Sequence, residues 1–198
     1  MRNFLALLSG LFQRATDPFR KKDARGYDTK RQRRRPMIAI CVGHSRSGDR
    51  GAESVGGVSE WEFWQPIAYR AAEILRDKGM SAKVVDVYDG GSYGAAMSWL
   101  GRHLEEMGAV RTVELHFNSA GPSAEGHEWI YWGGSKLGAA LAKDLEAAHS
   151  ERFPGFRCRG VKGKGMSDRG GLFLRRTPCP AVICEAFFGS NRKEWVEY

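Results

Sequence analysis

The sequence predicts an α/β fold: a single three-layer domain with a mostly parallel, twisted sheet flanked by helices, preceded by a basic N-terminal tail. Two observations support this prediction. Short apolar runs rich in β-branched residues alternate with longer stretches of helical periodicity, which is typical of a parallel sheet covered by helices. The chain has 198 residues, 42% of them hydrophobic, and is long enough to bury a sizeable core in one domain.

The net charge of +8 is confined to the start of the chain. Residues 1–36 contain eleven Lys or Arg and three Asp, whereas residues 37–198 contain twenty basic and twenty acidic residues. The predicted domain, residues 37–198, is therefore electrically balanced, and we expect no specific nucleic acid partner. No run approaches the roughly 20 apolar residues of a membrane-spanning helix, which argues against a polytopic membrane protein.

Residues 1–36 form a predicted tail with two different halves. Residues 1–14 carry a short apolar, amphipathic stretch, which fits a signal peptide, a helix lying on an anionic membrane or an unstructured terminus. Gln13 and Arg14 stand where a signal peptide would have small residues for cleavage. Residues 17–36 end in a basic run, from which we expect contact with an anionic membrane or wall polymer, a solvated linker being the alternative.

The first predicted elements of the domain are a buried strand and a helix. Residues 37–42 are a continuous apolar run after a proline, as in a strand buried on both faces. A glycine-rich loop leads to Ser59 and Glu62, whose spacing is that of a capping box at the start of a helix. Pro66 predicts either a kink in this helix or a regular helix that starts only at Gln65.

The rest of the chain continues the alternation. Apolar runs predict further strands over residues 82–87, 110–117, 128–132 and 181–184. Helical periodicity predicts helices over residues 95–107 and 135–149, each with one apolar face. If the strands are parallel, their carboxyl ends lie at one edge of the sheet, where ligands of open α/β folds bind.

Four cysteines stand at positions 41, 158, 179 and 184, and their spacing matches no CxxC motif of zinc or redox sites. Cys41 and Cys184 lie within predicted strands, where a free thiol behaves as a small apolar side chain. We expect inert thiols, because disulfides are rare outside oxidising compartments. The sequence leaves a disulfide between Cys158 and Cys179 open.

Four ionisable residues follow predicted strands or begin the first helix. His44, His116 and Glu185 stand at strand ends, and Glu60 stands at the helix start. Two histidines and one glutamate are a standard ligand set of catalytic zinc, which leaves a fourth position for water. A further carboxylate beside that water can act as general base. The pattern therefore predicts His44, Glu60 and His116 as zinc ligands and Glu185 as the catalytic base, with Glu62 assigned to the helix cap.

Each of these residues also has a purely structural interpretation. A histidine at a strand end is more often a hydrogen-bonded polar residue than a ligand, and Glu60 could simply favour a helix N-terminus. His103 and His149 are expected on solvent-exposed helix faces, and His127 is expected to line the cleft. The convergence of four residues from distant parts of the chain favours the metal interpretation over the structural one.

Four blocks of sequence strengthen this interpretation. They are Gly43-His44 with Asp49–Ala52, Ser59-Glu60, Leu115–Ala120 and Pro180–Asn191. In type and order they resemble the motifs of the zinc-dependent N-acetylmuramoyl-L-alanine amidases of the type-three amidase family, over about residues 38–191. The last two blocks are similar to that family's His-x-Asn-Ala and Pro-Ala-Val-x-x-Glu-x-x-Phe-x-Ser-Asn motifs.

The resemblance implies a function and a cofactor. It implies a peptidoglycan hydrolase that cleaves the amide between N-acetylmuramic acid and the first L-alanine of the stem peptide, with Zn²⁺ held by the same three residues. Asn118 would contact substrate or support a ligand. Two departures stand out: Cys41–Arg46 replaces the family's Asp-x-Gly-His-Gly-Gly, and the family's final helix is either shortened to residues 192–198 or missing.

The resemblance also predicts where the protein acts, and it leaves two alternative functions open. We expect a monomer that acts at the bacterial cell wall, in the periplasm or outside the cell. Its short catalytic domain resembles phage lysis enzymes, which implies phage-encoded release at lysis. The alternatives are another zinc peptidase or deacetylase on the same metal set, and a catalytically silent protein that binds wall or membrane.

Overall fold

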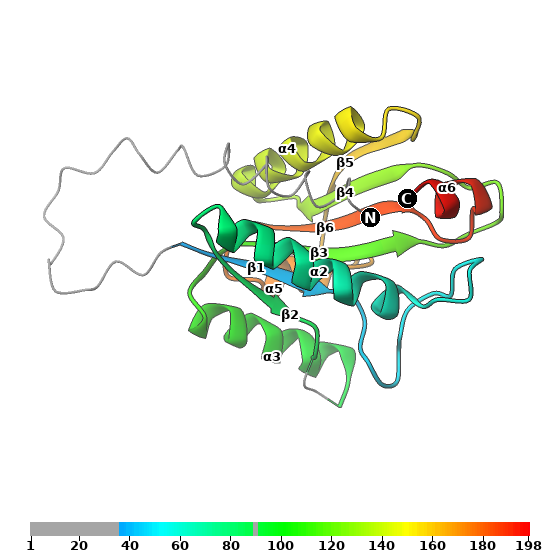
Figure 1. The fold of residues 1–198 in the computed structure, drawn as a ribbon. Coiled ribbons are helices and arrows are strands. Elements are labelled where there is room, and N and C mark those ends of the chain that lie inside the picture. The colour runs from blue at the N-terminus through cyan, green and yellow to red at the C-terminus, as the bar shows by residue number, and fades with distance from the viewer. Residues whose placement is uncertain (1–35, 89–90) are drawn as a thin grey trace, which may run out of the picture.

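Six strands form one sheet with helices on both faces (Figure 1). The computed structural model describes residues 36–88 and 91–198. The strands are β1 (Met37–Val42), β2 (Ser81–Val85), β3 (Ala109–Asn118), β4 (His127–Trp132), β5 (Cys158–Lys164) and β6 (Ala181–Phe188). The helices are α2 (Glu60–Asp77), α3 (Tyr93–Glu106), α4 (Lys136–Arg152), α5 (Gly171–Arg176) and α6 (Arg192–Glu197). The predicted α/β fold class is confirmed.

The predicted tail, residues 1–36, lies outside the described residues except for Pro36. The division of the chain at residue 36 therefore stays a prediction. Within the described part of the chain, no helix combines the length and the apolar composition needed to cross a membrane.

The sheet has the order β2-β1-β3-β6-β4-β5, and four of its five strand pairs are parallel. The exception is the antiparallel pair of β4 and β6. Strands β1, β3 and β6 are neighbours and run the same way, so their carboxyl ends lie together at one edge of the sheet. Residues that follow these three strands are thereby brought close in space.

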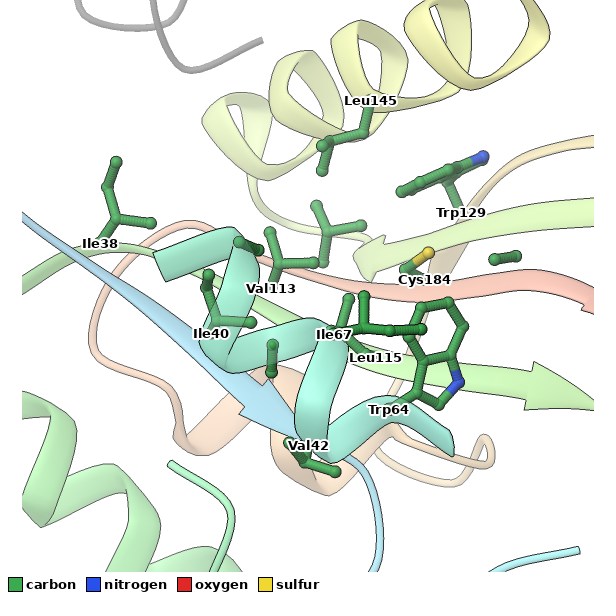
Figure 2. Close-up of a cluster of buried hydrophobic side chains, with 14 of the residues drawn as sticks. Ile38, Ile40, Val42, Trp64, Ile67, Val113, Leu115, Trp129, Leu145 and Cys184 are labelled. Atoms are coloured by element: carbon green, nitrogen blue, oxygen red, sulfur yellow. The ribbon is translucent and has the colours of Figure 1, made fainter. Parts of the chain in front are cut away.

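Each face of the sheet has its own hydrophobic core. Helices α2, α4 and α6 cover one face, and α3 and α5 cover the other (Figure 1). Side chains of β1 alternate between the two: Ile40 faces the α2 side, whereas Cys41 faces the α3 side. Figure 2 shows Trp64 of α2 and Leu145 of α4 in the first core. Burial on both faces explains why β1 is a continuous apolar run.

Helix α2 begins where the capping box predicts. The Ser59 hydroxyl accepts a hydrogen bond from the Glu62 amide, and the Glu62 carboxylate accepts one from the Ser59 amide. The helix continues through Pro66, so the alternative in which regular helix starts at Gln65 is wrong. Pro66 is exposed, which leaves water free to satisfy the Glu62 carbonyl that loses its helical donor.

The C-terminal residues belong to the core. A helix follows the last sequence block, namely α6, so the alternative in which this element is missing is wrong. Asn191 caps it by accepting hydrogen bonds from two helix amides, and the buried Glu194 accepts bonds from the amides of Gly126 and Phe188. Tyr198 stacks on Phe187, with ring centroids 4.3 Å apart.

Two histidine predictions are wrong. His149 is completely buried rather than exposed, and His127 is buried against it, with ring centroids 4.2 Å apart, rather than lining the cleft. The reason is spacing: Leu141, Leu145 and His149 are four residues apart, which places all three on the inward stripe of α4. His103 is half-buried and stacks on Trp99.

Strand β5 and helix α5 were not predicted. In β5 glycine and basic residues surround a single valine, as suits an edge strand with little apolar surface to bury. Helix α5 has six residues and no side-chain cap. All four cysteines are free thiols; Cys158 lies on edge strand β5, whereas Cys179 contacts Thr112 of β3.

Candidate metal centre

The carboxyl edge of the sheet brings three of the predicted site residues together. His44 follows β1, His116 lies near the end of β3, and Glu60 is the first residue of α2. Glu60 Oε1 lies 3.3 Å from His44 Nε2, and Glu60 Oε2 lies 3.0 Å from His116 Nδ1. One potential ligand atom from each residue lies within 4.8 Å of the other two. Such a spacing can hold a cation.

The local backbone makes this approach possible. A Cβ atom at Gly43 would lie 2.2 Å from the His116 ring, so only glycine leaves room for that ring. His44 has a φ of 67°, which is in the left-handed region and turns the chain sharply after β1. Among the described residues other than glycine, His44 alone has a positive φ. Sequence and backbone thus cooperate to aim both imidazoles at Glu60.

Charge in this cluster is strongly coupled. Burial would raise the pKa of Glu60, but hydrogen bonding to His116 and the closeness of His44 outweigh it and hold that pKa well below its usual range. Burial would lower the pKa of both imidazoles. Nearby carboxylates outweigh this effect of burial. Glu60 raises the pKa of His44, and Glu114 together with Glu60 raises the pKa of His116. Glu60 is therefore ionised at neutral pH and offers a negative charge to a bound ion.

Unsatisfied polar atoms indicate that this site binds something. Asn118 Nδ2 and Glu185 Oε2 are each shielded from solvent and without a hydrogen-bond partner within the described residues, and buried His44 Nε2 has only the Glu60 carboxylate, 3.3 Å away. All three residues line one cleft of about 1120 Å³. Leaving buried polar atoms unpaired is costly, and two imidazole nitrogens with a carboxylate are ligands that suit zinc. The residues present therefore fit a zinc ion.

Glu185 lies beside this cluster on β6. It is paired in register with His116 of β3 on one side and with Glu128 of β4 on the other. Burial raises the pKa of Glu185 to about 7, although the charge of His116 opposes that rise. Glu128 is held by ion pairs with Lys162 and Arg159. Glu185 Oε2 thus remains free to exchange a proton near neutral pH.

A second cluster, His127 with Glu146 and Cys158, also has metal-ligand spacing. A hydrogen bond to His127 prevents its neutral imidazole from binding a metal ion. Trp129 Nε1 donates to His127 Nδ1 over 3.0 Å, so the ring proton of a neutral imidazole must be on Nε2. Neither nitrogen then has a lone pair for a metal, and we assign this cluster no site.

Sequence reasoning missed one residue of the site. Glu114 is buried and lies 3.2 Å from His116 Nε2 through its Oε2 atom. The signal was present, because Glu114, His116 and Asn118 are two residues apart and side chains of a strand alternate between faces. Glu114 was missed because a carboxylate within a strand can also face solvent.

Comparisons with known proteins identify the family and the fold of this chain. The family model of N-acetylmuramoyl-L-alanine amidases matches residues 38–196. The N-acetylmuramoyl-L-alanine amidase AmiC2 of Nostoc punctiforme has a similar fold, with a TM-score of 0.66 and 23% identity, over 81% of this chain and 84% of that one. The catalytic domain of the CD27L endolysin, which targets Clostridia Difficile, has the same TM-score and identity, over 82% and 87%.

A third similar structure is the catalytic domain of CwlV, an N-acetylmuramoyl-L-alanine amidase from Bacillus (Paenibacillus) polymyxa var. colistinus. It has a TM-score of 0.61 and 23% identity, over 81% of this chain and 85% of that one. The comparison with curated proteins gave no match. The similar structures support the fold. The family model spans most of the chain and indicates the class of reaction, hydrolysis by an N-acetylmuramoyl-L-alanine amidase.

Proposed function

The chain belongs to the N-acetylmuramoyl-L-alanine amidase family, and on that premise we propose that it performs the family's reaction with zinc bound by His44, Glu60 and His116. The enzyme is a peptidoglycan hydrolase that cleaves the amide between N-acetylmuramic acid and the L-alanine of the stem peptide. One observation carries the proposal: two imidazole nitrogens and an ionised carboxylate converge beside the unpaired carboxylate oxygen of Glu185.

Each residue has a defined task in this proposal. His44, Glu60 and His116 would hold the ion, which when bound acidifies water and polarises the scissile carbonyl. Glu185 accepts the proton of the attacking water and then donates it to the leaving amine of alanine. A pKa near 7 suits both steps, because the carboxylate must take up and release the proton in one cycle.

Asn118 is the proposed substrate contact. Its Nδ2 donor is buried in the cleft and has no partner among the described residues. A carbonyl oxygen of the substrate would satisfy that donor and orient the scissile amide next to Glu185. The walls of the same cleft carry two exposed apolar side chains, Tyr93 and Met166, on which sugar or peptide can lie.

The cell wall is where this family acts. We propose that the enzyme is released at lysis, which the likeness to an endolysin catalytic domain supports. We also propose that the tail, residues 1–36, contacts an anionic membrane or wall polymer, because it carries the whole net charge of the chain.

Product analysis tests the proposed reaction. The full chain is incubated with purified peptidoglycan, and the new amino and reducing ends are identified. We expect new alanine amino termini and no new reducing sugar ends, in proportion to bound zinc. A digest that frees amino termini of other residues, or none at all, would refute the proposal.

A further inference from the structure

Each histidine of the proposed zinc site has a carboxylate behind it. His44 Nδ1 lies 3.2 Å from Asp49 Oδ2, and His116 Nε2 lies 3.2 Å from Glu114 Oε2. The other nitrogen of each ring faces Glu60. This nitrogen is Nε2 in His44 and Nδ1 in His116. His44 therefore faces the proposed metal position with Nε2 and His116 faces it with Nδ1. In each ring, the nitrogen on the other side contacts the carboxylate of Asp49 or Glu114.

The two carboxylates differ in burial. The Asp49 side chain is 82% exposed, whereas that of Glu114 is 6% exposed. Glu114 is also fixed from its other side, because Tyr88 Oη donates a hydrogen bond of 2.8 Å to Glu114 Oε1. Both carboxylate oxygens of Glu114 are thereby occupied, one by Tyr88 and one by His116. A buried carboxylate held at both oxygens is a rigid acceptor.

We propose that Glu114, held by Tyr88, is a positioning residue that keeps the ring proton of His116 on Nε2. A neutral imidazole carries one proton, and an ionised carboxylate only accepts hydrogen bonds. With the proton directed at Glu114, the lone pair is on Nδ1 and points toward Glu60 and the ion. The side chain also fixes the rotation of the ring, as carboxylates behind metal-ligating histidines do.

This inference rests on the proposed zinc site, and Asp49 provides a matched comparison within it. Water can replace the exposed Asp49 as acceptor for His44, since solvent screens that contact. Water has little access to Glu114. Loss of the two carboxylates should therefore have unequal effects, although both lie 3.2 Å from a histidine of the same site.

The test measures zinc affinity of the full chain by competition with a chromophoric chelator. We expect Glu114→Gln to weaken zinc binding 10- to 100-fold, the range for such supporting groups. Tyr88→Phe should have a smaller effect, and Asp49→Asn should change affinity less than about threefold. The melting temperatures of the metal-free variants show whether the fold is kept. A folded Glu114→Gln protein that binds zinc as tightly as the wild type would overturn the inference.

Nitrogen NMR of the zinc-loaded wild type gives a second readout that needs no variant. With histidine labelled by ¹⁵N, we expect His116 to show a proton on Nε2 and a metal-shifted Nδ1. Zinc bound through Nε2 of His116 would overturn the inference while leaving the proposed function intact. A wild-type protein that binds no zinc would instead remove the proposed zinc chemistry, and this inference with it.

Discussion

Replacement of Glu185 by glutamine separates catalysis from metal binding. The substitution keeps the size of the side chain but removes its ability to take up a proton. Glu185 is not among the three residues that converge on the proposed ion, so Glu185→Gln should keep near-stoichiometric zinc. General acid–base groups contribute about 10²–10⁴ in rate, so turnover should fall at least ~10².

The same substitution has a calculable effect on the metal-free protein. The pKa of Glu185 rises from 4.5 to about 7 on folding, so the folded state prefers the protonated carboxyl. The stability that this preference provides is present below pH 4.5 and lost as pH rises through 7, a difference of up to about 3 kcal/mol. Glutamine does not ionise. Above pH 7 the metal-free Glu185→Gln protein should therefore unfold at higher denaturant concentration than the metal-free wild type.

Three measurements on each protein test this reasoning: zinc content by elemental analysis, denaturant unfolding at pH 5 and pH 8 after metal removal, and release of peptides from peptidoglycan. His116→Ala is the comparison variant, and it should lose zinc and turnover together. An active Glu185→Gln enzyme with zinc bound would refute the role of general base. A Glu185→Gln enzyme without zinc would show that Glu185 holds the ion instead.

Three further predictions concern the ion, the tail and a buried histidine. Prolonged chelation should abolish turnover and added zinc should restore it; full activity after complete chelation would remove zinc from the mechanism. A chain starting at Met37 should fold, hydrolyse soluble wall fragments and bind anionic liposomes less well than the full chain, with a difference that shrinks as salt is added; equal binding would leave the tail without this role. Burial lowers the pKa of His149 to about 2. The free energy of unfolding should therefore fall as pH drops below 6.5, because His149 binds a proton in the unfolded chain but not in the folded chain. Unfolding at pH 7.5 and pH 5 should show a smaller loss for His149→Phe than for the wild type, with His103→Gln as the control; equal losses in His149→Phe and wild type would contradict this account.

The elements that position the site could be predicted because their burial is visible in the sequence. β1 lies between two cores and must be apolar at every position, and the capping box at Ser59 is a local signal that needs no tertiary information. The closeness of His44 and His116 followed from one topological rule, that parallel strands end at the same edge. Glu60 was placed with them as the first residue of the helix that follows β1.

Residues whose role depends on a distant partner could not be predicted. Glu114 resembles a solvent-facing residue until Tyr88, 26 positions earlier in the chain, is placed against it. His149 was assigned to solvent by its polarity, although its spacing from Leu145 indicated the core. β5 buries little, so its sequence carries little of the pattern by which strands are predicted.

The backbone of His44 has a consequence for the protein if the proposed ion is lost. A residue other than glycine in the left-handed region is held there at a cost on the order of 1 kcal/mol. The proposed cation would draw the imidazole toward Glu60 and so help to hold this conformation. Without it, relaxation of the segment from Gly43 to Asp49 would relieve the strain at His44. We expect a protease to nick this loop before any strand of the sheet, so that the cleavage pattern of a stored sample reports how much of it still carries metal.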